Sequence, residues 1–144
     1  MLKLSKKTEY AIIALMAMTN GDGDKLYTSK ELSRKHNIPP ELMGKVMQSL
    51  AKNNLIVSHQ GVKGGYQLTG NLSNINIISV ITAVEGPLQV VDCVSMEDCD
   101  CNQLSSCNIK GPMEMIQNEL FSFLGNISLK DLKEKYTPMV TFID

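Results

Sequence analysis

The chain lacks tryptophan, and only 5% of its 144 residues are aromatic. Its apolar runs stay well short of the roughly 20 residues that cross a bilayer, and the N-terminus lacks the apolar core of a signal peptide. We therefore expect a cytoplasmic protein with no membrane contact. The chain also lacks G-x-S-x-G and Walker motifs and has no Cys/His pair near its cysteines, so we do not expect an enzyme.

Cysteine is absent except in one window of fifteen residues, which holds Cys93, Cys99, Cys101 and Cys107. Cytoplasmic thiols are kept reduced, so a dense group there favours metal binding or redox chemistry over a disulfide framework. Structural zinc usually takes two Cys-x2-4-Cys pairs, whereas the spacing here is x5, x1 and x5. The spacing favours an iron-sulfur cluster, with a zinc site or redox-active thiols as alternatives.

Charge is divided unevenly between the two halves of the chain. Residues 1–70 hold ten Lys and Arg against five Asp and Glu, a net charge of +5, and residues 71–144 hold four against ten, a net charge of −6. A basic half joined to an acidic half indicates that one end meets a polyanion while the other end has a different task.

The basic half begins with a pattern typical of a helix-turn-helix. After a first amphipathic helix that starts near Leu4, Thr28 and Glu31 form the capping box of a short helix that runs to about His36. A turn that contains Pro39 follows, and Pro40 suits the first turn of a third helix. The inner face of that helix is apolar, with Leu42, Met43, Val46, Met47 and Leu50. Such a helix can enter the major groove of DNA with its polar outer face.

Two short strands are predicted after these helices. Residues 55–58 and 66–68 have strand character, and the Gly-rich segment 61–65 between them is typical of a turn. The pair predicts a hairpin wing whose tip, with Gln60 and Lys63, can approach a phosphate backbone or a minor groove.

The acidic half predicts a short helix over residues 77–84, then the cysteines, then a longer helix. The apolar residues of this longer helix recur at alternating intervals of four and three residues: Ile109, Met113, Ile116, Leu120, Phe123 and Ile127. This spacing is typical of a helix that pairs with a second copy, although a helix folded back on its own chain would give the same stripe. Pro112 predicts that the regular part starts near that residue. A last helix can begin at Ser128.

Three sequence features together resemble the Rrf-type winged-helix transcriptional regulators, a family that includes IscR, NsrR, RirA and CymR. They are the run from Leu4 to Ala11, the segment from Leu55 to Gly64-Gly65-Tyr66, and the cysteines beyond Val84-Glu85-Gly86. The resemblance implies a mainly α fold with a small β-hairpin wing: a winged helix-turn-helix domain over residues 1–86, a cysteine loop over residues 87–111, and a dimerisation helix with a C-terminal tail over residues 112–144.

The resemblance also implies a function. Such proteins bind palindromic promoter DNA as homodimers, often as repressors, and many sense iron-sulfur status, redox state or nitric oxide through a [2Fe-2S] or [4Fe-4S] cluster, which implies a cluster donor as a further partner. The DNA contacts of the family fall here on Thr28, Ser29, Pro39, Pro40, Glu41, Lys45, Gln60, Gly61 and Lys63.

By the same resemblance, the metal ligands are Cys93, Cys101 and Cys107, with Cys99 and Glu9 as further candidates. The two histidines, His36 and His59, both lie in the basic half, so a histidine ligand beside the last cysteine is excluded. Glu9 stands where some family members carry a ligating carboxylate, and it also suits the first turn of a helix for its dipole alone. The alternatives are a metal-free or zinc-containing regulator of the same fold, as CymR exemplifies, and an iron-sulfur electron-transfer protein.

Overall fold

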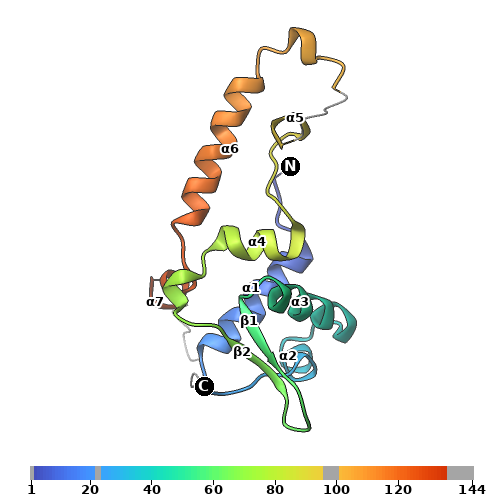
Figure 1. Ribbon diagram of the computed structural model, residues 1–144, viewed down its shortest axis with the longest axis vertical. Coiled ribbons are helices and arrows are strands. Elements are labelled where there is room, and N and C mark those ends of the chain that lie inside the picture. Colours follow the sequence, from blue (N-terminus) through green and yellow to red (C-terminus); the bar gives the residue numbers. More distant parts are fainter. Residues whose placement is uncertain (1, 22–23, 96–100, 136–144) are drawn as a thin grey trace, which may run out of the picture.

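The structure is a computed structural model that describes residues 2–21, 24–95 and 101–135. The molecule is elongated (Figure 1): a body of helices with a hairpin occupies one end, and the cysteine loop occupies the other. The predicted ligand Cys99 and the tail after Pro138 lie outside the described residues.

Three helices build most of the body: α1 (Lys6–Thr19), α2 (Ser29–His36) and α3 (Pro40–Lys52). Side chains that recur every three or four residues point inward and form one core, in which Leu15, Met43, Met47 and Leu50 are fully buried. The first and third helices lie close to the positions that the apolar periodicity predicts, and α2 agrees with the prediction at both ends.

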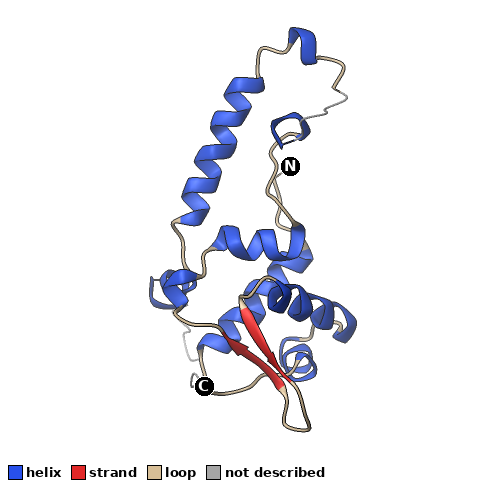
Figure 2. Ribbon diagram, in the orientation of Figure 1, coloured by secondary structure: helices blue, strands red, loops and turns tan. Residues whose placement is uncertain are grey.

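The predicted wing is present as an antiparallel hairpin of β1 (Ile56–His59) and β2 (Gly65–Leu68), paired from Ile56 opposite Leu68 to His59 opposite Gly65. Figure 2 shows these as the strands of the described fold, projecting past the helices. Tyr27 adds one bridge to Tyr66 on the other edge of β2, so the segment before α2 is tied to the wing.

Helix α4 (Ile77–Glu85) follows a short 3-10 turn, η1 (Leu72–Asn74). It starts in a capping box, in which the Asn76 side chain accepts the amide of Ser79 at 2.8 Å and the Ser79 hydroxyl accepts the amide of Asn76 at 3.1 Å. It ends at Gly86, whose φ of +84° favours glycine. The predicted helix over residues 77–84 is therefore confirmed.

The cysteine loop contains two short helical turns, α5 (Asp92–Ser95) and η2 (Leu104–Ser106), and leads into the long helix α6 (Lys110–Gly125). Pro112 is the third residue of α6, within the first turn, where a backbone amide has no acceptor inside the helix. The helix thus begins two residues before the proline, and Cys107 lies outside it, as the sequence predicts.

Helix α7 (Leu129–Lys135) returns the chain to the body. The Leu129 side chain is fully buried in the same core as α1 and α3. Lys133 donates from Nζ to the carbonyl oxygen of Thr19 at 2.8 Å, which places a cation at the C-terminal end of α1, a helix with no basic residue in its own last turn. The C-terminal end of α6 is therefore connected to an element that packs on the body, while its N-terminal end leads into the cysteine loop.

The described helices include none that is long and apolar enough to cross a membrane. The predicted fold class, a mainly α winged helix-turn-helix protein with a long C-terminal helix, is confirmed.

Candidate nucleic-acid interface and cysteine loop

The helix-turn-helix is held in shape by local hydrogen bonds. Thr28 caps α2, and its hydroxyl accepts the amide of Glu31 at 3.0 Å. The Glu31 carboxylate lies 3.8 Å from Lys25 Nζ. Asn37 ends α2 in the left-handed conformation, with a φ of 53°. The Ser33 hydroxyl then donates to the carbonyl of Ile38 across the turn.

The predicted recognition residues lie at the start and on the outer face of α3. Pro39, Pro40, Glu41 and Lys45 are all exposed, while Met43 and Val46 on the opposite face are buried. Thr28 is exposed and Ser29 half-buried at the start of α2. These positions leave their polar groups accessible to a ligand that approaches the helix pair from outside.

The wing tip carries the other three predicted contacts, Gln60, Gly61 and Lys63, all exposed. The turn needs its glycines: Gly61 has a φ of +117°, and a Cβ at Gly64 would overlap the carbonyl oxygen of His59. In Figure 1 the tip lies at the same end of the molecule as α2, opposite the cysteine loop.

Positive charge borders this surface. Lys30, Arg34 and Lys35 line an open depression along α2 together with Thr28 and Glu31. Lys7 of α1 and Lys45 of α3 line one small crevice, which the sequence patterns did not indicate because the two residues are far apart in the chain. The cations suit contact with phosphate groups.

The cysteine loop places Cys93 in α5 and Cys107 directly after η2, with Cys101 between them. All three thiols are half-buried and not in disulfides. The Cys101 thiol donates to Oε1 of Gln103 at 3.3 Å. Within the described ranges, no three His, Cys, Asp or Glu side chains are grouped so that they could hold a metal ion. The three thiols suit a cluster by their chemistry, but the described chain does not bring them to one point.

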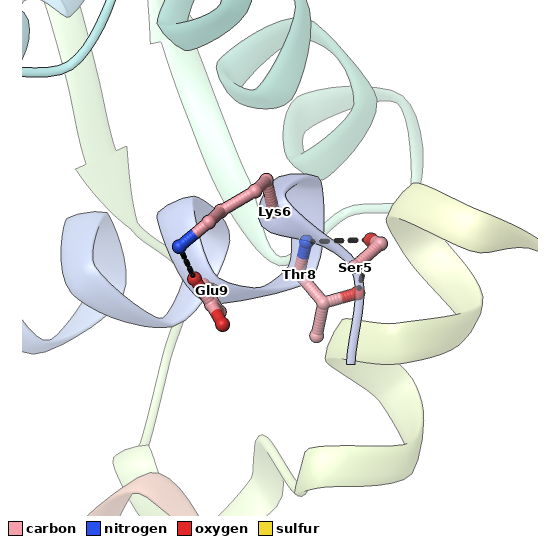
Figure 3. A network of polar contacts seen from close by, with 4 residues as sticks. All are labelled: Ser5, Lys6, Thr8 and Glu9. Carbon is pink, nitrogen blue, oxygen red and sulfur yellow. Dashed lines mark hydrogen bonds and ion pairs between the residues drawn. The ribbon is translucent and has the colours of Figure 1, made fainter. Parts of the chain in front are cut away.

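Glu9 lies in the first turn of α1, where Ser5 caps the helix by accepting the amide of Thr8 at 3.2 Å. Figure 3 shows its carboxylate against Lys6, with Nζ and Oε2 2.7 Å apart. This partner raises the pKa of Lys6, by hydrogen bonding first and by charge second. The Ser5 hydroxyl also contacts the carboxylate of Glu85 at the end of α4. Glu9 is thus in an ion pair on α1, and the described thiols of its own chain do not form a metal-binding group with it.

The patterns also missed a polar residue of α6. Gln117 is only 8% exposed, and its Oε1 accepts the backbone amide of Val90 at 3.1 Å. In the sequence, the burial of Gln117 is indicated only by its position directly after Ile116, a residue of the apolar repeat.

The fold and its exposed polar and basic surface define a winged helix-turn-helix DNA-binding protein. The chain belongs to the Rrf2 family, described as iron-dependent transcriptional regulators, whose profile matches residues 4–135. Members of this class act as regulators of transcription and are not enzymes.

Individual relatives agree with this assignment. The chain is 29% identical over 131 residues to the transcriptional regulator NsrR of Halalkalibacterium halodurans, which covers 91% of this chain and 90% of that protein. It is 26% identical over 142 residues to protein aau3 of Rhizobium meliloti, which covers 99% and 91%. Among solved structures, that of CymR, the global cysteine regulator of B. subtilis, matches with a TM-score of 0.73 at 23% identity and covers 96% of this chain and all of that one.

Proposed function

We propose that this chain is a homodimeric, cytoplasmic repressor that binds promoter DNA and senses iron-sulfur status, redox state or nitric oxide through a cluster on its cysteine loop. One observation carries the proposal. The exposed polar residues of α2, α3 and the wing lie at one end, the described thiols lie at the other, and α6 runs between them (Figure 1).

DNA contact is assigned to both helices and the wing. Glu41 and Lys45 on α3 face the bases of the major groove, with Pro39 and Pro40 at the helix start, and Thr28 and Ser29 approach the backbone from the start of α2. Gln60, Gly61 and Lys63 reach the backbone or the minor groove. The support is that eight of these nine residues are exposed and the ninth, Ser29, is half-buried.

Dimerisation is assigned to α6. The apolar repeat consists of two rows of residues seven positions apart, and the rows differ in solvent exposure within a single chain. Met113, Leu120 and Ile127 are half-buried, while Ile109, Ile116 and Phe123 are 50%, 39% and 64% exposed. We call the second set the exposed row. A helix folded back on its own chain would bury both rows. The exposed row favours contact with the same row of a second copy, which also suits a palindromic DNA site.

The cluster is assigned to Cys93, Cys101 and Cys107, with Cys99, or Glu9 of either chain, as the further ligand. A cluster with one non-thiolate or spare ligand supplies a site whose ligation changes on oxidation, nitrosylation or loss of iron. Ligation by Glu9 would compete with its ion pair to Lys6, in which Nζ and Oε2 are 2.7 Å apart. The loop must also bring the three thiols together.

A regulator of the same fold without an iron-sulfur cluster is the second candidate. Two observations favour it: the described thiols are not grouped for a metal, and the fold is shared with CymR. In that case the loop holds no metal, or it holds zinc once the loop brings the thiols together. The loop then acts as a partner surface or as a set of redox-active thiols.

Anaerobic purification separates these candidates. Brown, air-sensitive protein whose visible absorbance is lost in Cys107→Ala but kept in Ser105→Ala supports the cluster. Colourless protein with one zinc per chain, or with no metal, supports the second candidate. Visible and Mössbauer spectra then distinguish [2Fe-2S] from [4Fe-4S].

Sensing is tested by comparing operator affinity of the reconstituted and apo proteins at matched salt. A coupling of about 1 to 3 kcal/mol between cluster and DNA changes that affinity roughly 5- to 150-fold. Equal affinities of the two forms would contradict sensing through the cluster.

A further inference from the structure

Gln117 of α6 holds the chain segment that leads into the cysteine loop. It is the one residue of α6 that the described part of the chain buries, and it is polar. A buried amide is unfavourable unless it is hydrogen-bonded. Here its Oε1 accepts the backbone amide of Val90 at 3.1 Å, so the bond satisfies the side-chain oxygen and the peptide N–H.

The position of Val90 gives this bond its importance. Val90 lies in the irregular segment 87–91, which belongs to no helix or strand, and it precedes Cys93 by three residues. Between Gly86 and α5, the bond to Gln117 fixes this segment at one point on α6, and α5 also contacts α6. The bond to Gln117 and the contacts of α5 with α6 together fix the location of Cys93 relative to the long helix.

The same turn of α6 carries the exposed row. Ile116 precedes Gln117 directly, and successive residues of a helix lie about 100° apart around its axis. One face of this turn thus holds the cysteine segment, and the neighbouring face is exposed at Ile116, 39% of whose surface is accessible. A shift of the Val90 segment would therefore act on α6 at the level of the exposed row.

We propose that Gln117 is a positioning residue that fixes Cys93 against α6 and couples the state of the cysteine loop to the dimer helix. The coupling half of this inference rests on the proposed function. The positioning half concerns the apo protein alone and stands independently of any cluster.

The positioning half is tested by alkylation of the reduced, metal-free protein with iodoacetamide, with the rate at each cysteine resolved by mass spectrometry. Gln117→Leu keeps the bulk of the side chain and removes the acceptor, and we expect Cys93 to react at least about fivefold faster relative to Cys107, since loss of one buried hydrogen bond frees the segment. Gln117→Glu keeps an acceptor oxygen and should retain a ratio near that of the wild type. Asn118→Leu is the matched control on the exposed side of α6.

An unchanged Cys93 to Cys107 ratio in Gln117→Leu would overturn the positioning role. If that variant does not fold, as judged by circular dichroism, Gln117→Asn, whose shorter side chain withdraws the same acceptor, takes its place in the comparison. A faster Cys93 in Asn118→Leu as well would also overturn it, since the effect would then not depend on the bond to Val90.

The coupling half is tested by the ratio of operator affinities of reconstituted and apo protein. We expect Gln117→Leu to bring this ratio towards one while the apo affinity stays as in the wild type. A ratio kept in Gln117→Leu would overturn the coupling. A ratio of one in the wild type would instead contradict the proposed function, and the alkylation result would stand.

Discussion

At the scale of single residues, charge at the wing tip is the most direct way to test the DNA interface. Lys63 is exposed beside two glycines and takes part in none of the ion pairs of the described chain. A lysine in this position can contact a phosphate without first breaking an ion pair. The contact would release a counterion and contribute to the salt dependence of binding.

Lys63→Gln should therefore weaken DNA binding and make it less sensitive to salt. Each lost phosphate contact reduces the slope of log K against log salt by about 0.9, and a dimer can lose two. The slope is measured by fluorescence anisotropy on a labelled promoter fragment between low and high salt. Lys130→Gln, an exposed lysine of α7, is the control and should leave the slope unchanged. An equal change in both variants would contradict a specific role for the wing.

A second residue gives a prediction about pH. Asp131 accepts the Ser128 backbone amide at 3.0 Å and lies 3.2 Å from Lys135 Nζ. These contacts, the Ser128 amide first, lower its pKa from the ordinary 3.8. A lowered pKa means that the ionised carboxylate stabilises the folded state above pH 3.8 and that this contribution is lost as the pH falls through the folded pKa.

Asp131→Asn should therefore unfold more easily than the wild type near neutral pH, and the difference should shrink below pH 3.8. Urea midpoints taken at closely spaced pH values for both proteins measure this. If the two midpoint profiles run parallel through the acid range, the carboxylate does not contribute as its contacts indicate.

At the scale of elements, α6 is unusual because its two apolar rows have different environments. The half-buried row is partly covered by the chain itself, and α4 and α5 are elements that contact α6. The exposed row has no covering element in the described structure. Phe123 is 64% exposed there, and Met115, on another side of the same helix, is 61% exposed. The two residues therefore form a matched pair for testing the dimer.

If the proposed dimer forms through the exposed row, Phe123→Glu should dissociate it without unfolding the chain, while Met115→Glu should not. Burial of a phenylalanine side chain contributes about 1.5 to 3 kcal/mol, and a two-fold interface loses it twice. The dimer dissociation constant should therefore rise at least about 100-fold. Sedimentation velocity over a range of concentrations measures the change, and equal effects of the two substitutions would exclude the exposed row as the interface.

Helix α7 shows how a short helix late in the chain stabilises a core built by earlier helices. Its Leu129 is fully buried in the core of the body, and the backbone amide of Leu129 donates to the carbonyl of Ile75 at 2.8 Å. Leu129→Ala should lower the free energy of unfolding by about 2 to 5 kcal/mol, the usual range for a buried leucine. Urea titration measures it, and Leu104→Ala, at a leucine that is 43% exposed in the cysteine loop, should cost far less.

At the scale of the whole molecule, local patterns predicted the elements well and the long-range contacts poorly. Capping residues such as Thr28 and Asn76, the glycines of the wing and the proline turn before α3 act within a few residues, so their effects can be recognised in the sequence. The expected capping box at Thr28 is observed in one direction only, because the Glu31 side chain lies near Lys25 instead.

The contacts that organise the two ends join residues far apart in the chain. Gln117 and Val90 are 27 residues apart, and Lys133 and Thr19 are 114 apart. Neither pair has a local signal, since each depends on how α6 and α7 return to the body. The metal-ligand set is equally hard to predict from the sequence. The spacing indicated thiol chemistry at Cys93, Cys101 and Cys107, but whether the three thiols meet depends on how the whole loop folds. The division at residues 86 and 111, like the ligand and DNA-contact residues, stays a prediction.

The burial of Leu129 has a consequence for how the protein is made. Translation delivers residues 1–86, with all the predicted DNA-contact positions, well before Leu129 leaves the ribosome, yet the core between α1 and α3 lacks one of its fully buried side chains until then. The nascent winged helix therefore completes its core only after the cysteine loop and α6 have been synthesised. A polypeptide interrupted before α7 would carry all the predicted DNA-contact residues on an unfinished core, and a newly made chain completes this core only when the cysteine loop is already attached.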